Sequence, residues 1–194
     1  MNRFDRDFWE QHYKEKTTGW DIGYPSAPLK TYIDQLTNKE LKILIPGAGN
    51  AYEAEYLYQH GFNEVHILDL SAPPLENFKK RVPGFPKDKV IQGDFFAHSV
   101  QYDLILEQTF FCALAPALRP AYARKTHELL LAKGTLAGLL FDFELTDEGP
   151  PFGGSKPEYL RLFEHYFTIR VLEPANNSIE PRQGRELFMI LKNL

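Results

Sequence analysis

Short apolar runs alternate along this chain with segments of helical periodicity. The apolar runs lie at 41–45, 64–71, 89–92, 101–108 and 135–141. Runs of this length and composition predict strands that are buried on both faces of a sheet. Helical periodicity predicts helices at 52–60, 72–81, 117–131 and 157–166, and two final strands are expected at 167–172 and 186–191. Ser71 is predicted to cap the helix at 72–81, and Lys133-Gly134 to end the helix at 117–131.

This order of elements predicts the fold class. Five successive strand–helix units place their strands parallel in one sheet. The last two strands are joined by the polar segment 173–185, which predicts an antiparallel hairpin at the end of the sheet. We therefore expect an α/β, Rossmann-like fold, with a seven-stranded, mostly parallel sheet and helices on both faces. Ligands of such sheets bind beyond the C-terminal ends of the strands, at the switch point of the topology.

The N-terminal residues are predicted to form a helical cover. Aromatic residues at helical spacing predict a helix over 5–16, and Ser26 is predicted to cap a second helix over 27–36. The segment between them, 17–25, contains two glycines, a proline and Trp20, which indicates an ordered loop. Its large rings pack either on the core or on a ligand. At 194 residues one domain is expected, with 1–36 as the cover and 37–194 as the Rossmann-like core.

Composition narrows the classes of function. Hydrophobic residues make up 43% and charged residues 25%, as in globular proteins. A net charge of −4 without any Lys/Arg run argues against nucleic acid as a partner. The sequence shows neither an 18-residue apolar span nor an apolar signal core, so we expect a cytoplasmic protein without membrane contact. The single cysteine and the scattered histidines indicate no disulfide and no metal site.

The first apolar run leads into Pro46-Gly47-Ala48-Gly49-Asn50-Ala51-Tyr52-Glu53, which predicts a glycine turn that opens a helix. Glycines permit a sharp turn and a close approach of the backbone to a ligand. The stretch departs from the dinucleotide fingerprint, because Ala51 replaces its third glycine and Glu53 follows. A carboxylate opposes a diphosphate but suits a cationic ligand. The turn therefore favours S-adenosylmethionine (SAM) over NAD. The alternative role of Glu53 is to stabilise the first turn of its helix.

Three further carboxylates follow or end predicted strands. Asp69 lies about 20 residues after the glycine turn, where a carboxylate accepts hydrogen bonds from both ribose hydroxyls. Its alternative role is to cap the next helix. Asp94 is predicted either to accept from the adenine amino group, with Phe95 or Phe96 packing on the ring, or to stabilise its own turn. Glu107 is expected beside the donor methyl, where a ligand ammonium or ordered N–H groups must pair it.

The segment 108–114 is expected to face the transferable group. Its Phe110 and Phe111 are predicted to wall a dry pocket. Cys112 has no activating cation near it in the sequence, so we expect a small buried residue rather than a nucleophile.

Arginines are the candidate contacts for the acceptor. Arg119 opens the next predicted helix at the C-terminal edge of the sheet. It is either a solvated surface residue or a group that binds the acceptor. Arg182 and Arg185, in the last loop, are further candidates on the same reasoning.

These residues together resemble the thiopurine S-methyltransferase family, and within it the thiol and halide methyltransferases of the "harmless to ozone layer" type. The sheet pattern is also typical of class I methyltransferases. The resemblance covers most of the chain and rests on Gly19-Trp20-Asp21-Ile22-Gly23-Tyr24-Pro25, Ile45-Pro46-Gly47-Ala48-Gly49, Leu68-Asp69-Leu70-Ser71, Gly93-Asp94-Phe95-Phe96, Tyr102-Asp103-Leu104-Ile105, Gln108-Thr109-Phe110-Phe111-Cys112-Ala113, Arg119 with Ala121-Tyr122-Ala123, and Gly149-Pro150-Pro151-Phe152. The run from Gln108 to Ala113 is far more specific than the glycines.

The resemblance implies transfer of a methyl group from SAM to a small sulfur or halide nucleophile, such as a thiol, thiopurine, thiocyanate or halide, with S-adenosylhomocysteine (SAH) as product. The expected cofactor contacts are Trp20, Leu44, Gly47, Gly49, Glu53, Asp69, Leu70, Asp94, Phe95 and Glu107. The expected acceptor contacts are Phe110, Phe111, Arg119 and Arg182, with Arg119 as the catalytic residue. The chain departs from the family's usual pattern at Ala51-Tyr52-Glu53, at Glu107 in place of an aspartate, and at the acidic exit Asp142-Phe143-Glu144-Leu145.

The hypothesis for the mechanism is an in-line displacement at a sulfonium methyl. Such a reaction needs alignment and exclusion of water more than covalent help. Arg119 would lower the pKa of a thiol acceptor by its charge, and the Trp20 loop would close as a lid. We expect a monomer that acts on a small molecule.

Three other functions compete with this hypothesis. A nicotinamide oxidoreductase requires a complete G-x-G-x-x-G and a hydride-site pair, which the sequence lacks. The second alternative is a non-catalytic SAM-binding protein with the same fold, and the third is a methyltransferase for another small acceptor.

Overall fold

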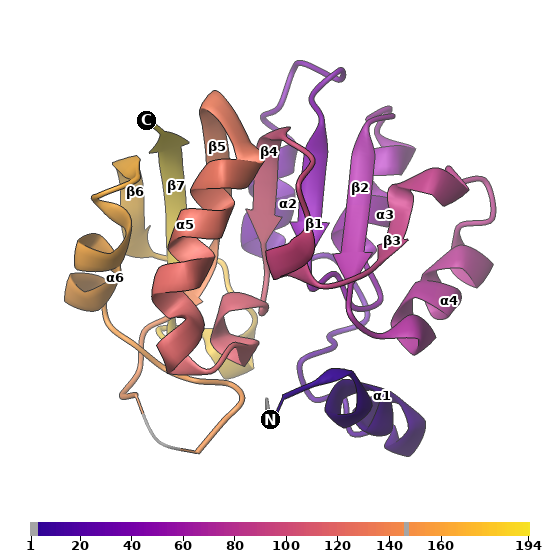
Figure 1. The fold of residues 1–194 in the computed structure, drawn as a ribbon, viewed down its shortest axis with the longest axis horizontal. Coiled ribbons are helices and arrows are strands. Elements are labelled where there is room, and N and C mark those ends of the chain that lie inside the picture. The colour runs from indigo at the N-terminus through magenta and orange to yellow at the C-terminus, as the bar shows by residue number, and fades with distance from the viewer. Residues whose placement is uncertain (1–3, 146–147) are drawn as a thin grey trace.

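The computed structural model describes residues 4–145 and 148–194. Its centre is a seven-stranded sheet with the strand order β3-β2-β1-β4-β5-β7-β6, whose strands stand side by side in Figure 1. The strands are β1 Ile43–Pro46, β2 Val65–Asp69, β3 Val90–Gln92, β4 Tyr102–Glu107, β5 Leu130–Phe141, β6 Phe167–Pro174 and β7 Glu186–Asn193. Strands β1 to β5 pair in parallel, and β7 is antiparallel to both β5 and β6. The predicted fold class is confirmed.

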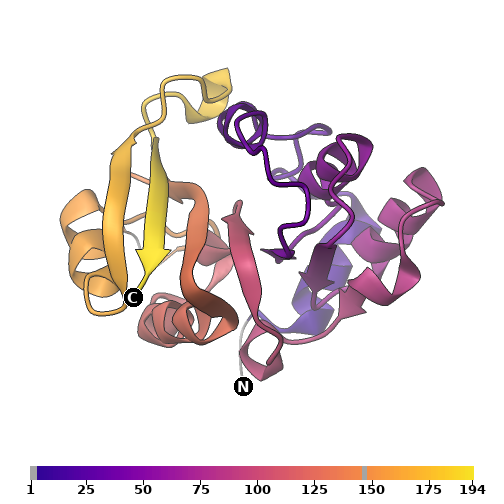
Figure 2. The ribbon, with the colours of Figure 1, turned by 90° about the horizontal axis from the view of Figure 1, so that it is seen from above.

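Helices cover both faces of the sheet. They are α1 Arg6–Glu15, α2 Ala27–Ile33, α3 Tyr52–Gln59, α4 Ala72–Arg81, α5 Arg119–Leu129 and α6 Lys156–Phe163. Seen from above in Figure 2, α2 and α3 (indigo to purple) lie on one side of the sheet, and α5 and α6 (red to orange) lie on the other. Helix α1 lies below the C-terminal ends of the parallel strands in Figure 1. It is therefore placed over the edge of the sheet where ligands of this topology bind.

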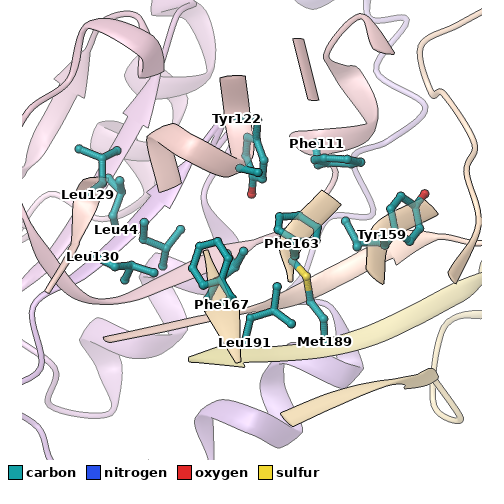
Figure 3. Close-up of a cluster of buried hydrophobic side chains, with 14 of the residues drawn as sticks. Leu44, Phe111, Tyr122, Leu129, Leu130, Tyr159, Phe163, Phe167, Met189 and Leu191 are labelled. Carbon is teal, nitrogen blue, oxygen red and sulfur yellow. The ribbon is translucent and has the colours of Figure 1, made fainter. Parts of the chain in front are cut away.

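Successive residues of the central strands point into two separate cores. Ile43 and Ile45 pack with the buried faces of α2, α3 and α4. Leu44, between them, points to the opposite face, where it joins Tyr122 of α5 and Phe163 of α6 (Figure 3). This alternation is the period-two geometry of a strand. It explains why β1 reads as an unbroken apolar run, because both of its faces are covered.

The two N-terminal helices differ in their burial. None of the residues of α1 is buried, whereas Leu29 and Ile33 of α2 are 0% and 1% exposed and lie in the core with β1. The predicted cover over 1–36 thus includes one helix that is part of the layered core. Helix α1 and the loop after it, in contrast, lie over the edge of the sheet.

One predicted boundary is wrong. We expected the helix at 117–131 to end at Lys133-Gly134, but α5 ends at Leu129 and β5 begins at Leu130. The amide of Asn193, at the end of β7, donates to the carbonyls of His127 (3.2 Å), Leu130 (3.0 Å) and Leu131 (3.2 Å). A distant side chain therefore binds the carbonyls at the end of the helix, and no local cap is needed.

The predicted serine caps are also wrong. Neither Ser26 nor Ser71 makes a side-chain cap to its helix. Their backbone N–H groups instead donate to carboxylates, that of Ser26 to Glu53 at 2.9 Å and that of Ser71 to Asp69 at 2.8 Å. These two carboxylates therefore order the turns that surround the site.

Candidate active site

The C-terminal ends of strands β1 to β5 surround a cavity of about 1070 Å³. The cavity lies at the switch point of the sheet, because β2 and β3 extend from one side of β1 and β4 lies on its other side. Helix α1, the loop 17–26 and the β6–β7 connection also contribute to its wall. Small-molecule sites usually measure about 300–1,000 Å³. The cavity therefore has room for a cofactor and a second small molecule.

The glycine turn forms the floor of the cavity between β1 and α3. Gly47 and Gly49 have φ angles of 56° and 53°, in the left-handed region that favours glycine. A side chain at Gly47 would also collide with the ring of Phe110. Ala51 takes a left-handed conformation too, with φ of 55°, although it has a Cβ. The turn thus brings bare backbone to the cavity, as the sequence predicts.

Asp69, the last residue of β2, lies in the cavity wall and joins two turns. Its Oδ2 accepts from the N–H of Gly49 and its Oδ1 from the N–H of Ser71, both at 2.8 Å. Burial raises the pKa of this carboxyl, and the backbone donors lower it in part. Each carboxylate oxygen retains a further lone pair for a ligand hydroxyl. Both the predicted ribose contact and a structural role in the turns are compatible with this geometry.

Asp94 follows β3 and also lines the cavity. Its Oδ1 accepts from the N–H of Phe96 at 2.9 Å, which is the turn-stabilising alternative predicted from the sequence. The side chain is exposed, so its second oxygen is accessible to a ligand amino group. Phe95 is buried and packs against Phe110, with ring centroids 5.2 Å apart.

Glu53, in the first turn of α3, is 7% exposed and lines the cavity. Burial raises the pKa of its carboxyl, while the N–H of Ser26 and the charge of Arg182 lower it. The guanidinium of Arg182 also donates to the carbonyl of Trp20 at 2.8 Å and lies 3.8 Å from the carboxylate of Glu186. Arg182 therefore joins the loop after α1 to the β6–β7 connection and balances two buried carboxylates.

Aromatic side chains form the wall that α1 and its loop contribute. The ring of Trp20 meets those of Trp9, His12 and Tyr13 edge to face, at centroid distances of 5.4, 5.6 and 5.9 Å. Burial, and secondarily the charge of Asp69, raises the pKa of Tyr13 well above its usual value. These residues form an aromatic wall of the cavity, in which Tyr13 lies beside Asp69 at the end of β2 and beside Gly49 of the glycine turn.

Glu107 is fully buried at the end of β4 and does not line the cavity. Its Oε1 accepts from the N–H groups of Phe110 and Phe111, both at 2.8 Å, and its Oε2 from the hydroxyl of Tyr122 at 2.7 Å. Ordered protein donors thus satisfy this carboxylate, which was one of its two predicted alternatives. Burial raises the pKa of Glu107 to about 7. Its role is to hold the segment after β4, and the expectation of a direct cofactor contact is not supported.

Arg119 is 3% exposed and lies outside the cavity wall. Its Nη1 pairs with Glu158 of α6 at 2.6 Å, and its Nη2 donates to the carbonyl of Gly153 at 2.6 Å. The guanidinium also lies over the ring of Phe111, 4.9 Å from its centroid. The side chain thus ties α5 to α6 and to the loop before α6. These contacts do not support the expected contact with the acceptor, which stays a prediction.

The part of the cavity near β4 and β5 is mainly apolar. It is lined by Phe110, Cys112, Ala113, Leu114, Ala115, Leu118, Phe141, Phe143, Pro150 and Pro151, with Arg182 and Arg185 as cations. Cys112 is 6% exposed, and burial raises the pKa of its thiol far above the usual value, so it is not poised as a nucleophile. Arg185 is exposed and lies over the ring of Phe143, 4.5 Å from its centroid.

Most of the predicted site residues line this one cavity. They are Trp20, Gly47, Gly49, Glu53, Asp69, Leu70, Asp94, Phe95, Phe110 and Arg182. Leu44 and Phe111 do not, because both are core residues with at most 1% exposure. The sequence analysis placed Gln108 only within the segment 108–114 and did not single it out, and it missed Tyr13 in the wall. It also gave no site role to Ser71, which lines the cavity and whose buried hydroxyl has no partner among the described residues. Their position next to cofactor candidates was the available signal.

The described residues form neither a metal centre nor a membrane-spanning helix. Among the described residues, no group of three or more His, Cys, Asp or Glu is placed to hold a metal ion. No described helix combines the length and the apolar character needed to cross a membrane.

The fold and this cavity define a SAM-dependent methyltransferase. Asp69 ends β2, Asp94 follows β3, and Glu53 lies in the first turn of α3, with an aromatic wall beside them. This arrangement suits a ligand with several N–H and O–H donors and two positive charges. The chain belongs to the thiopurine S-methyltransferase family, whose sequence model matches residues 4–191.

Curated relatives agree with this family assignment, and solved structures share the fold. The probable thiol methyltransferase 2 of Arabidopsis thaliana is 29% identical over 184 residues, covering 92% of this chain and 81% of that protein. Thiocyanate methyltransferase 1 of Brassica oleracea is 28% identical, with the same coverage. The Burkholderia thailandensis 1,6-didemethyltoxoflavin-N1-methyltransferase, solved with SAH, shares the fold with a TM-score of 0.74 and 17% identity, covering 97% of this chain and 86% of that one.

Proposed function

We propose that this enzyme transfers the methyl group of SAM to a small sulfur or halide nucleophile, and that it works as a cytoplasmic monomer. The observation that carries the proposal is one large cavity whose wall combines two kinds of residue. Glu53, Asp69 and Asp94 line it, and so do apolar residues of the segments after β4 and β5, with Arg182 and Arg185 from the β6–β7 connection. The relatives named for thiol and thiocyanate substrates support a sulfur acceptor.

The carboxylate side fits SAM. Glu53 is the proposed partner of the α-ammonium, Asp69 of the ribose hydroxyls and Asp94 of the adenine amino group. The orphaned hydroxyl of Ser71, beside Asp69, is a further polar group for the cofactor. Gly47 and Gly49 let the backbone approach, and Trp20 covers the site.

When bound, SAM supplies an electrophilic methyl group on a sulfonium. The residues of this chain need to align the nucleophile with that methyl group and to exclude water. Phe110 and Phe143 wall the acceptor side, and the loop of Trp20 covers the cofactor side.

Arg6, Arg182 and Arg185 are arginines that line the cavity. Arg182 is already bonded to the Trp20 carbonyl and lies 3.8 Å from Glu186. Arg185 is therefore our first candidate for the cation that favours a thiolate over a thiol by proximity of charge.

Calorimetry followed by a methyl-transfer assay tests the proposal. We expect SAM and SAH to bind one site per chain, and SAH to form when thiophenol, iodide, thiocyanate or a thiopurine is added with SAM. Binding without turnover on any of these acceptors would support the alternative of a non-catalytic SAM-binding protein. Absence of binding by SAH would overturn the cofactor assignment itself.

A further inference from the structure

We propose that Gln108 is a specificity-determining residue, which accepts a hydrogen bond from the methyl acceptor. The enzyme would therefore prefer sulfur nucleophiles that carry an N–H or O–H donor beside the sulfur. This inference rests on the proposed function and deepens it, because it names a chemical feature of the acceptor and the side chain that reads it.

The first observation is an unpaired polar atom in the cavity wall. Gln108 lines the cavity directly after Glu107, the last residue of β4. Its Oε1 is buried and accepts no hydrogen bond from any described residue. Buried side-chain oxygens are nearly always hydrogen-bonded, because an unpaired one has lost its water without compensation. A donor on a ligand in the cavity would supply the missing bond.

The second observation is that the backbone around Gln108 is held in place. Thr109, the next residue, has a φ of 57°, although it is β-branched. Such a conformation persists only where surrounding contacts enforce it, and it is concentrated at functional sites. The enforcing contacts are the two 2.8 Å hydrogen bonds from the N–H groups of Phe110 and Phe111 to Glu107. Gln108 is thus presented from a fixed turn.

The third observation is the side of the cavity on which Gln108 lies. SAM offers three kinds of donor: an ammonium, ribose hydroxyls and an adenine amino group. Glu53, Asp69 and Asp94 are proposed for these, and all three come from the β1–β3 side. Gln108 instead follows the end of β4, and it lines the cavity together with Thr109, Phe110 and Cys112 of the same segment. The acceptor is therefore the molecule left to pair with Oε1.

This geometry separates two kinds of acceptor. A thiol with a neighbouring N–H or O–H satisfies Oε1, whereas a halide or thiocyanate ion has no donor and leaves it unpaired. An acceptor without a donor leaves the buried oxygen of Gln108 unpaired. We therefore expect its kcat/KM to be lower than that of an acceptor with a donor, by roughly tenfold to a hundredfold.

Two isosteric thiols test the proposal. 2-Aminothiophenol has an N–H donor beside its sulfur, and 2-methylthiophenol has a methyl group of nearly the same size there. The measurements are kcat/KM with saturating SAM and the Kd of each thiol for the SAH complex, which is unreactive. The variants are Gln108→Leu, which removes the acceptor oxygen, and Gln108→Glu, which keeps one. Gln101→Leu, an exposed glutamine at the other end of β4, is the matched control.

We expect the wild type, Gln101→Leu and Gln108→Glu to prefer 2-aminothiophenol by roughly tenfold or more. Gln108→Leu should lose that preference in both kcat/KM and Kd, with the Kd of SAH unchanged. An unaltered preference in Gln108→Leu would overturn the proposal, and so would weaker binding of SAH, which would place the amide on the cofactor.

The binding measurement keeps this test separate from the proposed function. If the wild type methylated neither thiol but its Kd values showed a preference that depends on Gln108, the proposed function would fail for these thiols while the role of Gln108 would stand. If instead both thiols were methylated and Gln108→Leu kept the preference for 2-aminothiophenol, the proposed function would stand and the role of Gln108 would fail.

Discussion

At the scale of single residues, the site is a set of carboxylates whose roles differ although their sequence positions look alike. Asp69, Asp94 and Glu107 each end a strand or follow one directly. Asp69 and Asp94 keep oxygens toward the cavity, whereas Glu107 is enclosed by Phe110, Phe111 and the hydroxyl of Tyr122. Burial therefore decides which carboxylate can meet a ligand and which one organises the wall.

The titration of Glu107 should be visible in protein stability. Its pKa is raised from 4.5 to about 7 in the folded state, so between these values the folded protein holds a proton that the unfolded chain has lost. Stability should thus fall as the pH rises from about 4.5 to about 7, by on the order of 3 kcal/mol. Glu107→Gln has no such titration.

Denaturant unfolding from pH 4.5 to 8 measures this effect as the difference between wild type and Glu107→Gln. Taking the difference cancels the other carboxylates that titrate in the same window. Parallel stability curves for the two proteins would show that the pKa of Glu107 is the same in the folded and unfolded states, and would contradict its assigned pKa.

Asp69 is the residue whose change should weaken cofactor binding most directly. In Asp69→Asn an amide N–H₂ must replace one oxygen that now accepts from Gly49 or Ser71, and the charge that favours ribose hydroxyls is lost. We expect the Kd of SAH to rise roughly tenfold to a hundredfold. Asp94→Asn, which changes an exposed carboxylate, is the comparison, and it should raise the Kd of SAH by less than Asp69→Asn does. An equal rise in both variants would contradict the larger role assigned to Asp69.

At the scale of elements, arginines connect segments that are distant in the sequence. Arg119 joins α5 to α6 and to Gly153, and Arg182 joins the loop after α1 to the β6–β7 connection. Neither role is visible from the neighbours of these residues in the chain. Arg182 thereby holds the loop of Trp20, which lines the cavity, and Arg119 holds Gly153, which follows the lining residues Pro150 and Pro151.

Arg119→Met should destabilise the fold. It leaves Glu158 and the Gly153 carbonyl without their partner at a guanidinium that is 3% exposed. Glu158 is 32% exposed and can regain water. We therefore expect the free energy of unfolding to fall by about 3 kcal/mol, which is at the low end for a broken buried ion pair. Arg124→Met, on the exposed face of the same helix, should change stability by less than about 0.5 kcal/mol.

Urea unfolding measures both variants, and a steady-state assay at low temperature measures the KM of the acceptor. A structural role leaves that KM unchanged in the folded Arg119→Met protein. Normal stability with a raised acceptor KM would instead restore the contact with the acceptor that the sequence predicts.

Arg182→Met should loosen the cover of the cavity. It removes the donor to the Trp20 carbonyl and the charge that balances Glu53 and Glu186. We expect faster hydrogen exchange in residues 17–25 and faster dissociation of SAH. Exposed Arg161→Met on α6 is the matched control. Unchanged exchange in 17–25 would show that the aromatic contacts of Trp20 hold the loop without Arg182.

At the scale of the whole molecule, the sheet, the glycine turn and the cover meet at one edge. The cavity includes residues from α1 at one end of the chain and from the β6–β7 connection near the other. A ligand in it therefore contacts segments that only the folded protein brings together.

Ligand binding should consequently stabilise the complete fold. An excess of SAH of about 100 times its Kd adds about 2.7 kcal/mol to the free energy of unfolding, if the unfolded chain does not bind it. Thermal unfolding should show a single transition whose midpoint rises with SAH concentration. A midpoint that does not move, or a second transition that SAH leaves unaffected, would contradict one site within one cooperative unit.

The sequence by itself determined the class of fold and several residues of the cavity wall. Apolar runs and their spacing follow from local geometry, since a strand buried on both faces needs apolar residues toward both sides. The glycine turn and the carboxylates after β2 and β3 are equally local, because they lie at fixed distances from strand ends. Gly47, Asp69 and Asp94 could therefore be found without the structure.

Only the tertiary structure decided the partners of side chains at long range. It paired Arg119 with Glu158, enclosed Glu107, ended α5 through Asn193 and left Gln108 in the cavity wall. The physical reason is that the role of a polar group depends on what else is buried beside it. Those neighbours come from distant parts of the chain, so the acceptor side could not be derived from residue spacing.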